Sequence, residues 1–371
     1  MIGVGVSLPE LAVRGGGWSP ASLFAGGVSG TMPDLSDLST LFQDEAGATP
    51  VASDADVVGL MIDQSQGGLG NLGPELVTNG GFDTDLSGWD IVGDGSAVSV
   101  SGSLSITGGA VSNTGVRQDI SLQNGTYLVP IGGVGGSSPR FGIYDGVSTI
   151  ISNQIGSVSD VIVTITQGVM RVYPYTSAGL TALYDSISVR GIPGNHASQS
   201  TTSYKPKWYA PNILRFDGVD DRLPMTLKPT TAGSIAVRFK ANVGNCVVFG
   251  ARPSGTTGKC YVSLASDGSI AGGVGDDGAG QIKGSTDKLG VFVTAILTWD
   301  GTTVTLYEDG VSVYSAAQSG AVDTANPHFF GSLNFDGSSA AHFDGDVSNL
   351  IVTDDVITAS EALKLHNKWS A

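Results

Sequence analysis

Alternating apolar and polar residues, in short runs separated by glycine-rich turns, are the main pattern along this chain. The clearest example is TVTLYEDGVSVY, residues 303–314, where two alternating runs flank Glu308, Asp309 and Gly310. Alternation with a period of two places every second side chain on the same face of a strand, and an Asp-Gly pair between two such runs predicts a tight β-hairpin. Many strands of this kind predict an all-β protein built from sandwiches.

Comparable runs predict strands in both halves of the chain. Residues 117–122 and 161–166 alternate, and residues 57–62 form a nearly continuous apolar run that is typical of a buried strand. After residue 212 the expected strands lie in ILRFDGVDDRL, GSIAVRFKANV, CVVFGA, CYVSLA, VFVTAILTWDG, TVTLYEDGVSVYSA, PHFFGSLNF and DGDVSNLIVTD.

Two segments have helical spacing instead. Residues 34–42 carry four apolar side chains at that spacing, with Asp34 or Ser36 in position to cap one or two helical turns. At the end of the chain, Thr358 is followed three residues later by Glu361, which is the pattern of a capping box. We therefore expect a short C-terminal helix.

Composition supports the all-β expectation and excludes some partners. Glycine supplies 55 of 371 residues, about twice its average usage, and the length is enough for two or three domains. The formal charge of −16 and the pI near 4.4 oppose binding to nucleic acid and to anionic lipid surfaces. The longest apolar runs are too short for a membrane span, and the N-terminus lacks the basic residues of a secretory signal.

Two cysteines, Cys246 and Cys260, are equidistant from Pro253 in a predicted hairpin. They either face each other across two strands or remain buried free thiols, and we expect free thiols in a reducing cytoplasm.

Two separated fragments read as one motif. VGLMIDQSQGG, residues 58–68, and GNHASQSTTSYKPKWYAPNILRFDGVDDRL, residues 194–223, join into an Asp-x-Ser turn, an Asn-His pair and a Phe-Asp-Gly strand. This order resembles the opening of a laminin-G or concanavalin-A-like sandwich. We predict that residues 31–70 and 193–371 form such a sandwich, with His196 as a hydrogen-bonded turn residue.

The sequence between the fragments resembles another module. ELVTNGGFDTDLSGWDIVG, residues 75–93, is similar to the opening of jelly-roll carbohydrate-binding modules, in which Phe82 and Trp89 would be core residues. The joints GGLGNLGP and RGIPGN are rich in glycine and proline, as expected where one domain is inserted into a surface loop of another. We therefore predict an inserted jelly roll over residues 71–192.

The region upstream points to a location. Residues 23–65 resemble a block of virion structural proteins of tailed bacteriophages and prophages, most specifically at DLSTLFQD, residues 37–44. The resemblance implies a fibre or spike protein on the virion surface, with other virion proteins as partners. It also implies a homo-oligomer, and we expect a trimer.

Residues 1–30 are predicted to be an attachment arm. Ile2, Val4, Val6 and Leu8 alternate with small residues, and a short uncharged strand at a free end is suited to adding to the sheet edge of another subunit. The alternative is a disordered tail.

Candidate glycan-binding residues lie in the insert. Tyr173 and Tyr175 point the same way on one expected strand, with Tyr144 and Arg171 near them in the order of the module family. Aromatic faces beside polar groups are typical of sugar sites. The alternative is that these are ordinary half-exposed sheet tyrosines.

Asp217, Asp220 and Asp221 cluster in one turn and are candidate calcium ligands, because calcium takes six or more oxygen ligands and related sandwiches often bind it at their rim. Asp336, Asp344 and Asp346 form a second cluster. Neither cluster matches a calcium loop, so solvated turn aspartates are the favoured alternative and no cofactor is required.

No catalytic pattern is recognisable. The Glu-x-Asp-x-x-Glu strand of related glycosidases and the Gly-x-Ser-x-Gly nucleophile turn are absent from the sequence, so we expect no enzymatic activity. The function predicted is a virion structural protein that displays two sandwiches for binding host-surface or environmental glycans. A purely architectural decoration protein is the alternative, and a polysaccharide-degrading enzyme is a weaker one.

Overall fold

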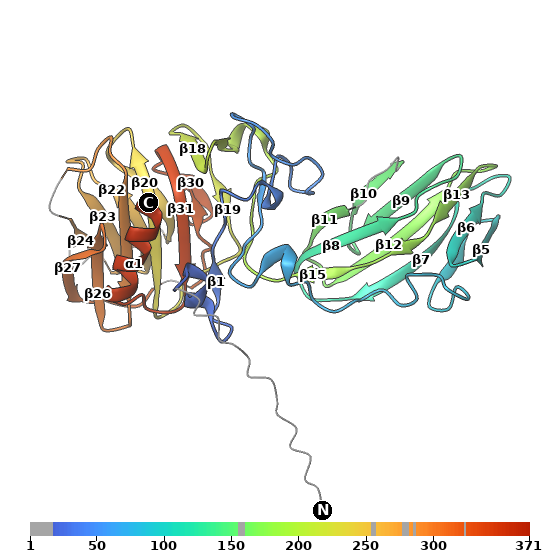
Figure 1. Ribbon diagram of the computed structural model, residues 1–371, viewed down its shortest axis with the longest axis horizontal. Helices are drawn as coiled ribbons and strands as arrows, with labels where there is room; N and C mark the ends of the chain where they lie inside the picture. Colours follow the sequence, from blue (N-terminus) through green and yellow to red (C-terminus); the bar gives the residue numbers. More distant parts are fainter. Residues whose placement is uncertain (1–17, 155–159, 254–256, 277–281, 285–286, 323) are drawn as a thin grey trace, which may run out of the picture.

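The computed structural model describes residues 18–154, 160–253, 257–276, 282–284, 287–322 and 324–371. Two β-rich bodies lie side by side along the long axis of the molecule (Figure 1). We call residues 73–192 the insert and the rest of the described chain the host. The fold class expected from the sequence is confirmed, since both bodies are β-sandwiches and α1 (Ala359–Ser370) is the one α-helix among the described residues.

The host has two large sheets. The first, which we call the helix-covered sheet, contains in spatial order β17 (Lys207–Tyr209), β18 (Ile213–Asp217), β31 (Asp344–Thr353), β20 (Gly233–Ala241), β25 (Val293–Trp299), β26 (Thr303–Glu308) and β27 (Val311–Ala317), with β1 (Gly30–Thr31) beside β31. The second contains β19 (Leu223–Pro224), β28 (Phe329–Phe330), β21 (Cys246–Arg252), β22 (Lys259–Leu264), β23 (Ile270–Gly275) and β24 (Ile282–Lys283), with β29 (Leu333–Phe335) and β30 (Ser338–Ala340) beside β21.

The apolar residues of the two sheets meet between them. Phe216 of the Phe-Asp-Gly strand is 1% exposed and packs edge-on against Phe330 and Phe343, with ring centroids 5.1 and 5.9 Å away. On β20, Ile235, which faces this core, alternates with Ala236, which faces the other side of the sheet. The sequence pattern therefore produces a sheet that is apolar on both faces, so its outer face requires a cover.

Helix α1 supplies part of that cover, and the segment before β1 supplies the rest. Leu365 of the helix packs with Leu23 and Phe24 of η1 (Pro20–Phe24) on the outer face of the helix-covered sheet. This differs from the predicted attachment arm, because Leu23 and Phe24 are buried against the host. Residues 1–17 of the arm, including Ile2, Val4, Val6 and Leu8, lie outside the described residues.

The local signals at the end of the chain are confirmed. Glu308 pairs with Val311, and the two residues between them, Asp309 and Gly310, have φ of 50° and 81°, as a two-residue β-hairpin turn requires. The hydroxyl of Thr358 accepts the N–H of Glu361 while the Glu361 carboxylate accepts the N–H of Thr358, which completes the capping box.

The expectations for residues 34–62 are only partly right. The helix predicted over residues 34–42 is one 3-10 turn, η2 (Leu38–Thr40), capped by Asp37, and the chain then enters β2 (Leu41–Phe42). The buried strand predicted over residues 57–62 is reduced to β3 (Leu60–Met61), which pairs with β2 and with β16 (Ala197–Ser198). This small sheet replaces helical hydrogen bonds with bonds to distant strands. The remaining short elements of the host are η3 (Gly68–Gly70) and η4 (Thr202–Tyr204).

The insert has three sheets. Its five-stranded sheet contains, in order, β10 (Thr149–Gln154), β9 (Pro139–Tyr144), β12 (Val169–Thr176), β7 (Thr114–Ser121) and β4 (Asp90–Val92). A second sheet contains β11 (Asp160–Ile165), β8 (Gly125–Gly132), β14 (Ser186–Ile187) and β15 (Arg190–Ile192), and a third contains β13 (Thr181–Tyr184), β6 (Ser103–Thr107) and β5 (Ser96–Val100). The third sheet forms the end of the insert that is farthest from the host (Figure 1).

The insert has its own core. Phe82 and Trp89, which the sequence places inside, are 0% and 7% exposed and pack with each other at 5.4 Å between ring centroids. The two ends of the insert meet, because the N–H of Gly73 donates to the carbonyl of Gly191 at 2.9 Å. A separate core and adjacent ends are what an insertion into a surface loop requires.

Host and insert also share an apolar contact. Phe42, Leu60 and Ile62 of the host pack with Ile162 and Ile192 of the insert. The N–H of Ile162 donates to the carbonyl of Ala46 at 3.0 Å, so the edge of β11 is bonded to the host. The two sandwiches are therefore joined by packing as well as by the chain.

Both cysteines are buried free thiols. They do not face each other, because the β21–β22 register pairs Cys246 with Leu264 and Cys260 with Ala251. Among the described residues, no helix is long and apolar enough to cross a bilayer.

Candidate functional site

The four predicted glycan-binding residues meet on the outer face of the five-stranded insert sheet. Phe141 and Ile143 of β9 and Met170 and Val172 of β12 face the insert core. Alternation therefore turns the residues between them outward, and the strand register places Tyr144 opposite Arg171. Tyr173 and Tyr175 follow Arg171 on the same face of β12.

These residues surround a hollow of about 300 Å³. Its described lining consists of Asn113, Gly142, Ile143, Tyr144, Thr149, Arg171, Tyr173 and Tyr175. The size is at the lower end of the range of small-ligand sites and suits one or two sugar residues. Gly142 lies opposite Tyr173 in the register, so the absence of a side chain there leaves room beside the tyrosine ring.

The two neighbouring tyrosines form a stack. The rings of Tyr173 and Tyr175 are 4.7 Å apart and nearly parallel, at 7°. Tyr175 is only 6% exposed, so it serves as the support and Tyr173, which is partly exposed, presents ring surface to solvent. Burial raises the pKa of Tyr173, so its phenol remains a neutral hydrogen-bonding group.

Arg171 is held in place by a carboxylate. Its Nε and Nη2 donate to the two oxygens of Asp119 at 2.5 and 2.8 Å, a bidentate pair, and its guanidinium lies 5.6 Å from the centre of the Tyr144 ring. These hydrogen bonds hold the pKa of Asp119 below its usual range. The pair gives this edge of the hollow fixed polar groups without a net charge.

One residue of this face was not among those predicted from the sequence. Arg140 lies directly opposite Tyr175 in the β9–β12 register and is partly buried. The alternation that points Tyr144 outward also points Arg140 outward, four residues earlier, so the signal was present in the sequence. What could not be seen was that its charge has no acidic neighbour.

The second predicted site also comes together. Single oxygens of Asp217, Asp220 and Asp221 all lie within 4.8 Å of one another in the turn after β18. One oxygen of Asp217 accepts the N–H of Val219 at 2.8 Å, and one of Asp221 accepts the N–H of Asp217 at 3.0 Å. These are turn-forming bonds, in agreement with the alternative reading of the cluster.

Asp221 distinguishes this cluster from an ordinary turn. It is 5% exposed, and burial together with the neighbouring Asp217 raises its pKa to about 7. Three crowded carboxylates are hard oxygen donors of the kind calcium prefers, and a divalent cation would relieve their repulsion. The donor chemistry therefore fits calcium, with further ligands to come from water or backbone oxygens.

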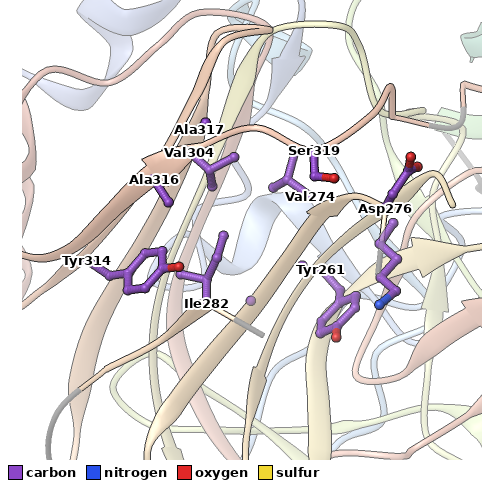
Figure 2. Close-up of a pocket in the computed structure, with 12 residues that line it drawn as sticks. Tyr261, Val274, Asp276, Ile282, Val304, Tyr314, Ala316, Ala317 and Ser319 are labelled. Carbon is purple, nitrogen blue, oxygen red and sulfur yellow. The ribbon is translucent and has the colours of Figure 1, made fainter. Parts of the chain in front are cut away.

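The host has hollows of its own, two of which lie beside its helix-covered sheet. Figure 2 shows the first, between the edges of the two host sheets, with Tyr314 and Tyr261 on opposite sides and Ile282 between them. It holds about 20 Å³, which is room for about one water molecule. The second, of about 530 Å³, lies between η1 and the end of α1. Among the described residues that line this second hollow, Trp369 is the one aromatic residue, and its ring packs on the helix-covered sheet.

The comparisons with known proteins concern the host and the type of fold. Residues 220–362 match the laminin-G type model of the concanavalin A-like lectin/glucanases superfamily. No curated protein sequence matches the chain. The match agrees with the two-sheet architecture of the host and supports the laminin-G-like part of the expected resemblance.

Three solved structures are similar over parts of their length. The CBM40 domain of the Ruminococcus gnavus IT-sialidase bound to α2,3-sialyllactose is 17% identical over 37% of this chain and 82% of that one, with a TM-score of 0.32. The heptameric SAP-like pentraxin of Limulus polyphemus is 16% identical over 42% of this chain and 82% of that one, with a TM-score of 0.35. The K499G mutant of the NanB sialidase of Streptococcus pneumoniae is 14% identical over 41% of this chain and 27% of that one, with a TM-score of 0.33. Similarities of this size are too partial to carry a conclusion about ligands.

Proposed function

We propose that this protein binds glycans in the hollow on the outer face of the five-stranded insert sheet. The observation that carries the proposal is the partly exposed ring of Tyr173, supported by Tyr175 and bordered by the Gly142 gap and the fixed Arg171–Asp119 pair. A flat ring beside an open floor and oriented polar groups matches the apolar face and the hydroxyl groups of a sugar.

The proposal is tested by removing the aromatic platform and by filling the space beside Gly142. Replacing both Tyr173 and Tyr175 with Ala should lower affinity on a glycan array about tenfold or more, since a stacking platform is worth about 1 kcal/mol or more. Gly142→Val should also abolish binding. A β-carbon at Gly142 would meet its nearest neighbour, the carbonyl oxygen of Ile151, at 3.5 Å, so the strand accepts the side chain while the hollow fills.

The matched control is Gly125→Val. Gly125 begins β8 on the other sheet, and its nearest contact would be Tyr127 at 3.9 Å. It should leave both folding and binding unchanged. If Gly142→Val binds as well as the wild type, the hollow is not the binding site. If the host alone binds the glycan, the site lies in the host.

The role proposed for the whole chain is that of a virion structural protein of the fibre or spike type. The support is the resemblance of residues 23–65 to a block of phage structural proteins, and the proposal includes other virion proteins as partners, a homotrimer and a position on the virion surface. Searching for the protein by cryo-EM in intact virus particles tests this role. Its absence from particles would leave only the glycan-binding role.

We propose a binding role rather than a catalytic one. None of the described residues that line the hollow carries a carboxylate, and Asp119, which pairs with the lining residue Arg171, is engaged by it. A glycosidase requires two carboxyl groups across the scissile bond. Release of reducing sugar from a bound glycan would overturn this assignment, and failure to bind any glycan would favour the purely architectural role.

Calcium is proposed as a ligand of Asp217, Asp220 and Asp221. The support is the buried Asp221 between two other carboxylates. Bound calcium would supply charge neutralisation there and would hold the turn between β18 and β19. The pH experiment that tests this proposal is described in the Discussion.

A further inference from the structure

The charges on the outer face of the five-stranded insert sheet do not cancel. Its strands carry three arginines and two aspartates there. Arg171 is paired with Asp119 through two hydrogen bonds, and Arg117 lies 3.8 Å from Asp90. Three positive charges and two negative ones leave one excess positive charge, which is that of Arg140.

Arg140 has no acidic partner in the described chain. Its Nε is buried and donates no hydrogen bond, and none of the ion pairs among the described residues includes it. The whole chain has 34 acidic residues against 18 basic ones, so an arginine that is left without a carboxylate is unusual for this protein. A buried donor without a partner is costly and requires an explanation, and a ligand that completes the bonding is one.

Arg140 lies next to the hollow, across from its lining residue Tyr175. It is directly opposite Tyr175, and residues opposite each other in an antiparallel pair have β-carbons about 4.5–5.5 Å apart. The next outward pair is Gly142 with Tyr173, and the one after it is Tyr144 with Arg171. Along the face, an unpaired guanidinium is therefore followed by the tyrosine platform and the glycine gap, and then by the neutralised arginine.

We infer that the hollow selects glycans that carry a carboxylate, such as hexuronate residues, and that Arg140 binds the carboxylate while the sugar ring lies against Tyr173. This inference rests on the proposed glycan-binding function and specifies its ligand class. A guanidinium is planar and donates two parallel N–H bonds, which matches a carboxylate better than it matches a sugar hydroxyl. The neutral pair of Arg171 and Asp119 is then left to bind hydroxyl groups.

The experiment uses the full chain and a panel of bacterial polysaccharides that contain carboxylated sugars, each beside its carboxyl-reduced neutral form. Wild-type protein should bind the carboxylated members at least tenfold more tightly than their reduced forms. Arg140→Gln should remove that difference, and Arg140→Lys should keep part of it, because lysine keeps the charge but lacks the planar fork. A sulfated dextran tests whether any polyanion suffices, and it should bind no better than unmodified dextran.

Arg190→Gln is the matched control. Arg190 is an exposed arginine of β15, on another sheet, where it lies 3.4 Å from Glu75. It makes the same change in net charge and should leave binding unchanged. Three results would overturn the inference: equal binding of acidic and reduced forms, equal losses in the two arginine variants, or a preference for sulfated dextran. In each case, loss of binding in Gly142→Val would still support the proposed glycan-binding function. If no glycan binds to wild type, the proposed function fails and the inference fails with it.

Discussion

The carboxylate of Asp63 accepts the N–H of Asn195 at 2.8 Å, although 132 residues separate them in the chain. The same carboxylate accepts the N–H groups of Met32 and Ser65, both at 2.8 Å, and the Asp63 N–H donates to Nδ1 of His196 at 2.9 Å. The two fragments that read as one motif in the sequence therefore meet around one buried side chain. The host closes at this point, with the insert leaving from the same place.

Asp63→Ala should destabilise the host strongly. Asp63 is 1% exposed, and its removal leaves several buried N–H groups without an acceptor, at an expected cost of about 3–5 kcal/mol. Urea unfolding followed by circular dichroism measures this. Asp300→Ala is the control, because Asp300 accepts comparable turn bonds in an exposed hairpin and should cost about 1 kcal/mol or less. Equal costs for the two variants would show that Asp63 forms an ordinary turn.

Replacing residues 73–191 by a short glycine-serine link should leave a folded host, because Gly73 and Gly191 are already hydrogen-bonded to each other. The product should be less stable by roughly 3 kcal/mol, since Phe42, Leu60 and Ile62 lose their cover. Calorimetry should show one cooperative transition. Ile162→Ser in the full chain is the companion variant that weakens the contact without deleting it. No sheet signal and no cooperative transition in the deletion product would contradict the division of the chain.

Removing residues 1–17 should abolish incorporation into particles without loss of stability, if the N-terminal region attaches the protein. Removing residues 1–30 should in addition destabilise the host, because Leu23 and Phe24 are 5% and 4% exposed and each contributes about 1.5–3 kcal/mol by burial. Incorporation assays and thermal melts of both truncations separate the two effects. Normal incorporation of the shorter truncation would refute the attachment role.

The raised pKa of Asp221 predicts that the stability of the host depends on pH and on calcium. Its pKa in the folded protein is about 7 against about 3.9 for an unperturbed aspartate, so the folded state binds the extra proton between these values and stability falls as the pH rises through that window. At pH 8, millimolar calcium should raise the melting temperature by about 2–4 °C for each kcal/mol of binding, and chelator should reverse this.

Asp221→Asn is the informative variant for this site. It removes the buried charge, so it should flatten the pH profile, abolish the calcium effect and make the calcium-free protein more stable at pH 8. Asp300→Asn, at an exposed turn, should do none of these. A melting temperature of the wild type that is indifferent to calcium would support the solvated-turn reading.

The features predicted correctly from the sequence depend on neighbours in the chain. Asp309 and Gly310 specify their hairpin, and Thr358 and Glu361 cap their helix, whatever the rest of the protein does. Alternation likewise placed Tyr173 and Tyr175 on one face of a strand, whereas Tyr144 and Arg171 were placed near them by the order of the module family. The core positions of Phe82 and Trp89 came from the resemblance to a module family rather than from periodicity.

The features that were missed depend on contacts between distant segments. Residues 34–42 have helical spacing, but Leu41 pairs with Met61, and that strand replaces the second helical turn. The β21–β22 register places Leu264, not Cys260, opposite Cys246. The β9–β12 register places Tyr175 opposite Arg140, while the β7–β12 register places Asp119 opposite Arg171, and such registers cannot be read from one sequence.

His328 predicts acid sensitivity in the host. It is 0% exposed, neither ring nitrogen has a hydrogen-bond partner, and its ring packs 4.7 Å from that of Phe249. Burial lowers its pKa to about 3, against about 6.5 in an unfolded chain. The unfolded state therefore binds more protons below pH 6.5, and stability falls as the pH drops from there toward 3, by about 2–3 kcal/mol at pH 4.5. Replacing His328 with Leu removes this titration and two unsatisfied nitrogens, so at pH 7.5 it should be neutral or mildly stabilising.

Urea unfolding of wild type and His328→Leu at pH 7.5 and 4.5 tests the prediction. The difference between the two proteins should grow toward low pH, because only the wild type must keep an imidazole uncharged inside the core. Phe330→Leu is the control, since Phe330 is also 0% exposed in the same part of the host but does not titrate. It should lower stability by the same amount at both pH values. If wild type and His328→Leu lose equal stability on acidification, the acid sensitivity of the host arises from groups other than His328.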